Sequence, residues 1–144
     1  MLTIAPLLPS DEAAWRVLFR GYCDFYTFDM PQSGYDRLWR EILAADRIHA
    51  RGAKREGKLL GIVHFLAHAN TWGKDVCYLE DLFTHPDARG QGVARALIAA
   101  VEAWARAQDC GRLYWMTHET NTTARALYDK VAQYRGFIRY QLDV

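Results

Sequence analysis

The stretch YLEDLFTHPDARGQGVARALIAAVEAW, which spans Tyr78–Trp104, decides the fold of this 144-residue chain. A β-rich run ends at Asp81-Leu82-Phe83-Thr84, and a basic, glycine-rich turn, Arg89-Gly90-Gln91-Gly92-Val93-Ala94, follows it. A long amphipathic helix begins immediately after that turn. Because the first amides of a helix lack partners within the helix, we expect an anion site here that is made mostly of backbone.

Length and composition bound the class of protein. A chain of 144 residues predicts one domain, residues 1–144, and 51% hydrophobic with 24% charged residues is typical of a globular protein. The formal net charge of +1 makes nucleic acid a poor partner. No apolar run approaches the roughly 20 residues that span a bilayer, so no membrane is expected. Three scattered cysteines and an N-terminus without a basic signal segment lead us to expect a cytoplasmic protein.

The rest of the chain predicts blocks of helix and strand. Three segments in the middle, joined by turns at Gly57 and Gly73, predict an antiparallel meander. The strand after Gly111 should lie parallel to the one before the glycine turn, through a right-handed crossover. The expected strands are 2–5, 48–55, 59–69, 76–84, 112–117 and 136–142, and the expected helices are 10–26, 35–45, 93–108 and 122–132. The order β-α-α-β-β-β-α-β-α-β predicts an α/β fold with a mixed, mostly antiparallel sheet flanked by helices.

The glycine turn suits a pyrophosphate. Gly90 and Gly92 remove side chains where a ligand would touch the backbone, and Arg89 adds a positive charge. A mononucleotide loop needs Gly-Lys-Ser or Gly-Lys-Thr, which the chain lacks. A dinucleotide fingerprint needs a third glycine where Arg95 stands. From these residues alone, an ordinary strand-to-helix turn stays open as the alternative.

Two spaced motifs decide between these alternatives. Arg89-Gly90-Gln91-Gly92-Val93-Ala94 resembles the Arg/Gln-x-x-Gly-x-Gly/Ala signature of the GCN5-related N-acetyltransferase (GNAT) superfamily, and Asn121-x-x-Ala124-x-x-Leu127-Tyr128 is similar to its second cofactor segment. Gly136-Phe137 resembles the family's closing Gly-Phe, after a longer preceding segment than usual. The Leu-Glu-Asp run at 79–81 resembles polyamine acetyltransferases. Residues 78–128 resemble the yeast Hpa2/Hpa3-type branch, whose members acetylate histone tails, polyamines or D-amino acids.

The resemblance implies acetyl-coenzyme A as cosubstrate. Its pyrophosphate is expected at the glycine turn, and its pantetheine is expected to add like a strand to the edge of the preceding β-rich run. The cofactor-binding positions that the resemblance implies are Leu82, Phe83, Thr84, Arg89, Gly90, Gln91, Gly92, Val93, Ala94, Arg95, Asn121, Ala124 and Tyr128. Asn121 is also expected to cap its helix.

The implied chemistry, acetyl transfer from a thioester to an amine, needs a neutral amine, a donor to the thioester oxygen and a proton for the departing thiolate. Tyr128 lies where the family places its thiolate-protonating tyrosine, and a phenol with a pKa of about 10 suits a thiol leaving group. Glu80 is the candidate base or amine anchor, two residues before Leu82 on the same expected strand face. A solvated strand end is the alternative for Glu80. Asp81 is expected to point the other way unless a bulge intervenes, and the Leu82 amide is the expected oxygen donor.

The segment between the first two helices is expected to cover the acceptor. Its aromatic and acidic residues suit a cation, with Tyr26 and Asp29 as expected contacts, and His118 and Glu119 are expected to face the same ligand. We expect a small primary amine such as a polyamine, an amino acid or a lysine-like compound. The alternatives are a lysine of a protein or histone tail and, in another class, a non-catalytic acyl-coenzyme A sensor. Histidine spacing predicts no metal, and a homodimer is expected.

Overall fold

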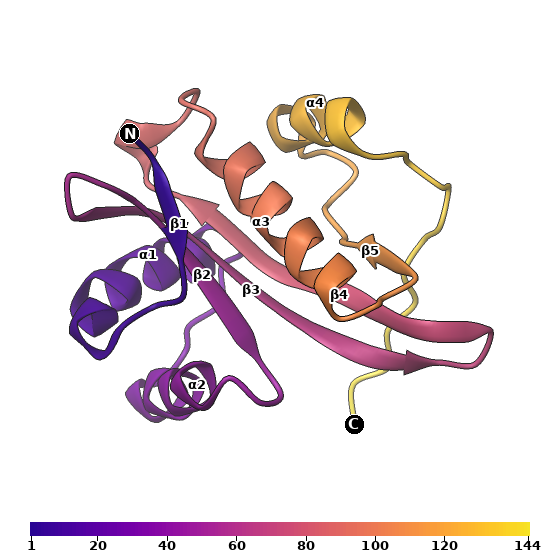
Figure 1. Ribbon diagram of the computed structural model, residues 1–144, viewed down its shortest axis with the longest axis horizontal. Coiled ribbons are helices and arrows are strands. Elements are labelled where there is room, and N and C mark those ends of the chain that lie inside the picture. The colour runs from indigo at the N-terminus through magenta and orange to yellow at the C-terminus, as the bar shows by residue number, and fades with distance from the viewer.

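The computed structural model describes residues 1–144 and contains one five-stranded sheet in the order β1-β2-β3-β4-β5, with helices on both faces (Figure 1). The strands are β1 Thr3–Ala5, β2 His49–Arg55, β3 Lys58–Asn70, β4 Gly73–Thr84 and β5 Arg112–Tyr114. The helices are α1 Glu12–Phe25, α2 Gln32–Ala44, α3 Val93–Ala107 and α4 Thr122–Val131, with short 3-10 turns η1 Pro9–Asp11 and η2 Pro86–Ala88.

The sheet is mostly antiparallel. Each neighbouring pair from β1 to β4 runs antiparallel, and only β4 and β5 run parallel. The parallel pair is joined by α3, because parallel strands need a crossover of this kind. The predicted α/β class, with a mixed and mostly antiparallel sheet flanked by helices, is confirmed.

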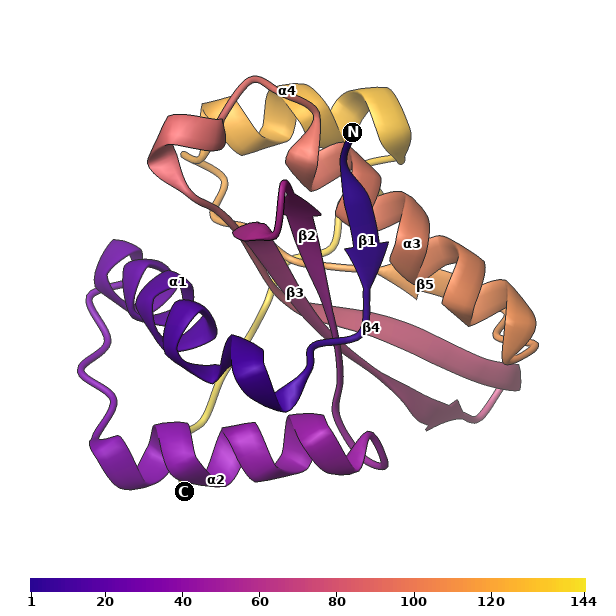
Figure 2. The ribbon, with the colours of Figure 1, turned by 60° about the vertical axis from the view of Figure 1, so that its left-hand side comes forward.

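Two apolar cores lie on opposite faces of the sheet, as Figure 2 shows from the placement of α1 and α2 on one side and α3 on the other. The first core is formed by α1, α2 and the sheet, and its largest fully buried side chain is Trp15. The second is formed by α3 and the other face, where Val93, Leu97 and Val101 are at most 1% exposed. These three residues are four apart in the sequence, so they form one buried stripe along α3.

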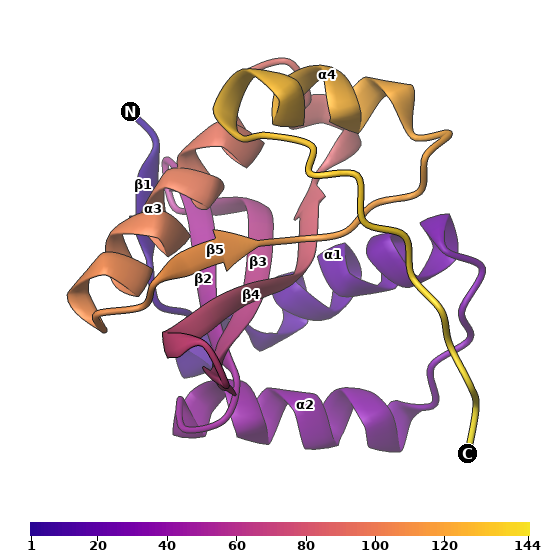
Figure 3. The ribbon, with the colours of Figure 1, turned by 90° about the vertical axis from the view of Figure 1, so that its right-hand side faces the viewer.

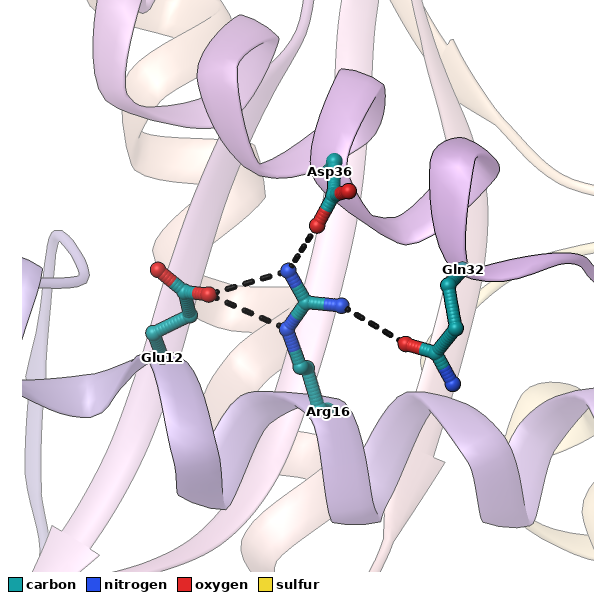
Figure 4. Close-up of polar contacts among 4 residues, drawn as sticks. All are labelled: Glu12, Arg16, Gln32 and Asp36. Atoms are coloured by element: carbon teal, nitrogen blue, oxygen red, sulfur yellow. Dashed lines mark hydrogen bonds and ion pairs between the residues drawn. The ribbon is translucent and has the colours of Figure 1, made fainter.

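Arg16 links α1 to α2 (Figure 4). Its guanidinium lies 2.9 Å from Glu12 one turn earlier on α1 and 2.5 Å from Asp36 on α2. A third contact, 3.2 Å long, reaches the side-chain oxygen of Gln32 at the start of α2. These contacts hold the two helices together at the end of the loop that joins them, the segment expected to cover the acceptor.

The last predicted strand, 136–142, does not form. After α4 the chain runs on without secondary structure, and Figure 3 shows it passing across the segment that leads from β5 to α4. Phe137 is 87% exposed and Leu142 is also 87% exposed. The apolar alternation of this segment is typical of a strand, but a strand needs a partner edge, and β5 forms a ladder over only three residues. The predicted strand 112–117 is shortened to Arg112–Tyr114, because the chain beyond Tyr114 diverges from β4.

None of the four helices is long and apolar enough to cross a membrane.

Candidate active site

A β-bulge interrupts β4 at Glu80. In the ladder with β3, His64 pairs with Asp81, whereas the next pair skips to Leu79, so Glu80 is the extra residue. Leu79 and Leu82 both pack against the α3 core, which shows that the alternation of faces is broken between them. The expectation that Glu80 shares a face with Leu82 is therefore wrong, because the extra residue places Glu80 with Asp81 on the α1 side.

The edge of β4 that faces β5 is open over half of the strand. β5 pairs only with Val76–Tyr78, so Leu79–Thr84 is paired on one side alone, with β3. Figure 3 shows the chain after β5 diverging from β4. The divergence leaves a gap in the ladder into which an extended ligand can add hydrogen bonds.

Backbone amides point into this open edge. The N–H of His85 donates to the carbonyl of Leu60 on β3 at 2.8 Å. Since backbone groups alternate along an antiparallel strand, the N–H groups of Leu82 and Thr84 point away from β3. The hydroxyl of Thr84 is buried and has no hydrogen-bond partner. An unpartnered buried hydroxyl beside free amides fits a polar ligand at the end of β4.

The glycine turn presents its backbone in the same region. Gly90 has φ +73° and Gly92 has φ +79°, and no atom lies within 4 Å of a Cβ built at either residue. Gly92 also begins α3, and no side chain caps that end of the helix. The first helical hydrogen bond there runs from Ala96 to Gly92 at 3.0 Å, so the N–H groups of the first turn have no helical partner. The turn is therefore suited to an anion.

Side chains around the turn hold its shape. Gln91 accepts a hydrogen bond from Arg55 at 2.5 Å and donates to the carbonyl of Asp87 at 2.9 Å. The guanidinium of Arg89 lies over the ring of Phe83, 5.8 Å from its centroid. The side chain of Gln91 is thus used in contacts within the protein. The guanidinium of Arg89 is held at the end of the open edge. The turn, the orphan hydroxyl and the open edge together fit the expected pyrophosphate and pantetheine of acetyl-coenzyme A.

Tyr128 lies near Tyr26, one of the expected acceptor residues. Burial, and to a smaller degree Tyr26, raises the pKa of Tyr128 to about 12. Its ring meets Trp115 edge to face with the centroids 5.4 Å apart. Tyr26 in turn lies 5.6 Å from His118, ring to ring. The fold therefore brings Tyr128, Tyr26 and His118 together from three separate parts of the chain.

Glu80 reaches solvent beside the carboxylate of Asp81. Its pKa is raised, first by partial burial and then by the neighbouring charge of Asp81, while Arg139 and His64 act in the opposite direction. Asp81 is more enclosed than Glu80, with a side chain 16% exposed. A carboxyl with a raised pKa next to a second carboxylate is the kind of group that binds an ammonium ion or accepts a proton from it.

Asn121 caps α4 as expected. Its side chain accepts from the N–H of Ala124 at 3.4 Å and donates to the hydroxyl of Thr117 at 3.0 Å. Asp29 and Glu119 are not brought into contact with the other expected residues. Both side chains are exposed and make no ion pair, and Glu119 contributes only its backbone carbonyl to a hydrogen bond.

Residue pattern alone missed a buried group beneath the site, His64 with Trp15. His64 contacts both Trp15 and Asp81, at 2.9 and 2.8 Å. Its partners are 49 and 17 residues away in the sequence, so no local spacing signals them. A cavity of about 340 Å³ lies elsewhere, at the end of α3 beside Trp104, and holds none of the expected site residues.

Comparison with known proteins agrees with this geometry. The acetyltransferase (GNAT) family matches residues 15–133. D-amino-acid N-acetyltransferase HPA3 of Saccharomyces cerevisiae is 30% identical over 147 residues, which cover 97% of this chain and 89% of that protein. Aminoglycoside N(6')-acetyltransferase type 1 of Salmonella typhimurium is 35% identical over 101 residues, 67% of each chain.

A solved structure shares the fold. The aminoglycoside acetyltransferase AAC(6')-Iy, in complex with the bisubstrate analogue CoA-S-monomethyl-acetylneamine, has a TM-score of 0.87 and 23% sequence identity, and the match covers 100% of this chain and 99% of that one. The chain therefore belongs to the acetyltransferase (GNAT) family. It is an acetyl-coenzyme A-dependent N-acetyltransferase.

Proposed function

We propose that this N-acetyltransferase acts on the primary amine of a small cationic acceptor, which attacks the acetyl group directly while Tyr128 acts as general acid. The observation that carries the proposal is the grouping of Tyr128 with Tyr26 and His118 beside the acidic, open half of β4. The named relatives act on D-amino acids and on aminoglycosides, which are amines as well.

Residues of this chain would hold acetyl-coenzyme A, which supplies an activated acetyl thioester. The glycine turn from Arg89 to Arg95 would bind its pyrophosphate, and the open edge at Leu82 and Thr84 would bind its pantetheine. The Leu82 amide points away from β3 and would donate to the thioester oxygen. Asn121 and Ala124, at the start of α4, would line the binding site of the same ligand.

Tyr128 would move one proton in the reaction. With a pKa raised to about 12, its phenol keeps its proton at neutral pH. The phenol would give that proton to the thiolate as the carbon–sulfur bond breaks and regain one from the attacking amine as the carbon–nitrogen bond forms. Glu80 would accept the proton that the acceptor ammonium loses before attack, or would anchor the ammonium through charge.

A thiol-release assay with a panel of amines tests the proposal. The panel holds a D-amino acid, a polyamine, an aminoglycoside, a free lysine analogue and a lysine-containing tail peptide. We expect turnover with at least one small amine and a lower kcat/KM with the peptide. A preference for the peptide would favour a protein-tail acetyltransferase. Binding of acetyl-coenzyme A without turnover on any amine would favour the sensor.

Assembly and location are proposals too. A homodimer is supported by the apolar side chains that the C-terminal segment leaves exposed, including Phe137 and Tyr140. Light scattering at assay concentration checks this, and a mass of one chain would refute it. A cytoplasmic location is supported by the three free cysteines, and cell fractionation checks it.

A further inference from the structure

A buried chain of side chains lies beneath the bulge of β4. Trp15 of α1 donates its indole N–H to Nε2 of His64 on β3 at 2.9 Å. Nδ1 of His64 lies 2.8 Å from Oδ2 of Asp81 on β4. Trp15 is 0% exposed and His64 1%, and Phe19 meets the imidazole edge to face at 5.0 Å. A single imidazole therefore joins a helix and two strands.

The two hydrogen bonds fix the protonation of this imidazole. An indole N–H can only donate, so Nε2 of His64 must accept and carries no proton. The ring proton is then on Nδ1, which donates to Asp81. Nδ1 thus donates to Asp81, and the carboxylate of Asp81 is held next to Glu80.

The imidazole also acts on the course of β4. His64 and Asp81 are opposite partners in the ladder, and the register shifts at the very next step. An inward-pointing carboxylate without a donor would be strongly disfavoured, because it would lose water and gain nothing in return. His64 therefore stabilises the strand conformation in which Asp81 points inward and Glu80 is the extra residue.

We propose that Trp15, His64 and Asp81 form a positioning unit for the acceptor amine, which fixes the bulge that presents Glu80 and holds the Asp81 carboxylate beside it. The inference rests on the proposed function, in which Glu80 is the base or amine anchor. It also specifies the acceptor class. Two adjacent carboxylates favour an ammonium group over a neutral or anionic ligand.

The charge of Asp81 has a measurable consequence at Glu80. The charged or titratable groups that face Glu80 come from all the elements packed around it: Asp81 and Tyr78 of β4, His64 of β3, Tyr114 of β5, Tyr22 of α1 and Arg139 of the C-terminal segment. After burial, Asp81 is the main cause of the raised pKa of Glu80. Removal of that charge lowers the pKa of Glu80, so Glu80 stays ionised to lower pH.

The variant Asp81→Asn isolates the charge, because asparagine keeps an acceptor oxygen for His64. We expect KM for the amine to rise about 10-fold, the loss of one charge-assisted contact. The acid limb of the pH profile of kcat/KM should move to lower pH, while calorimetry finds acetyl-coenzyme A bound as in wild type. A purely structural network would leave that limb in place, and an unmoved limb would overturn the role of the charge.

The variant His64→Leu isolates the bulge. We expect kcat to fall about 10- to 100-fold, the effect of a displacement near 1 Å at the reacting groups. Deuterium exchange should accelerate over 79–84 and stay unchanged over 76–78. Unchanged exchange over 79–84 would overturn the positioning role. If His64→Leu does not fold, Trp15→Phe removes the indole donor together with part of the buried ring, and it should change exchange over 79–84 in the same direction.

A matched control separates stability from positioning. Asp11 is another buried carboxylate, 8% exposed and 2.7 Å from Lys54, and Asp11→Asn should lower Tm without moving kcat or the acid limb. Failure of wild type to acetylate any amine would count against the proposed function alone. Deuterium exchange would still test whether His64 stabilises residues 79–84, because that measurement needs no turnover. An active enzyme with wild-type pH behaviour in Asp81→Asn and wild-type exchange in His64→Leu would count against this inference alone.

Discussion

The first half of β4, Gly73–Tyr78, and its second half, Leu79–Thr84, differ in how many neighbouring strands they have. Val76–Tyr78 pairs with β3 on one side and β5 on the other, and Val76 and Cys77 are at most 1% exposed. Leu79–Thr84 pairs with β3 alone, contains the bulge and ends in a hydroxyl without a partner. One strand therefore contributes a half with two neighbouring strands to the core and a half with an unpaired edge to the site.

The difference shows that the site lies where the sheet lacks a neighbouring strand. Unpaired strand edges are unfavourable because their N–H and C=O groups lack partners, and proteins usually cover or shorten them. Here β5 ends after three residues, and no other segment of the chain takes its place. A ligand that supplies the missing hydrogen bonds gains affinity from groups that the fold has left ready for it.

Removal of the Tyr128 hydroxyl should have the largest effect on chemistry at the open half. In Tyr128→Phe we expect kcat to fall about 10- to 10⁴-fold, because the departing thiolate loses its proton donor, while cofactor affinity changes little. Steady-state kinetics and calorimetry measure the two quantities. Tyr134→Phe is the control, since Tyr134 is 69% exposed and should behave as wild type. Wild-type kcat in Tyr128→Phe would remove Tyr128 from the acid role.

A side chain at Gly92 should weaken binding at the end of the open half. Gly92→Val places a branched side chain where the pyrophosphate is expected to meet backbone, and we expect acetyl-coenzyme A affinity to fall about 10- to 100-fold. Gly57→Val is the matched control, because Gly57 has φ +77° against +79° at Gly92 and equally open space around it. Both variants carry the same backbone strain. Equal affinities in the two variants would undo the assignment of the turn.

Local features of the fold could be predicted from the sequence. The helix expected at 93–108 is observed at Val93–Ala107. Its signals are local: the apolar stripe lies in the helix itself, and the glycine that begins it and the residues that end it lie directly next to it. The cap at Asn121 and the meander were predicted on similarly local grounds. The anion turn also depends on local chemistry, since two glycines with positive φ begin a helix.

The parallel pairing of β4 and β5 was predicted, but the finer non-local features, strand register and side-chain contacts between distant segments, were not. The bulge depends on the register between β3 and β4, so the face of Glu80 was predicted wrongly while that register was unknown. The network at His64 depends on Trp15, from another helix. The strand expected at 136–142 has the right alternation but lacks a neighbour, which residue pattern cannot supply. Each error concerns which segment lies beside which.

A substitution in the paired half of β4 should affect stability and leave chemistry alone. Val76 is 1% exposed, and Val76→Ala should lower the free energy of unfolding by about 1–3 kcal/mol through lost burial and a residual cavity. Urea unfolding measures this change, and kcat per folded molecule should stay at the wild-type value. Leu82→Ala, in the open half, keeps its backbone amide but removes a side chain that is only partly buried, so it should destabilise less. If Val76→Ala also lowers kcat per folded molecule, the two halves of β4 are coupled. The division between a structural half and a chemical half then does not hold.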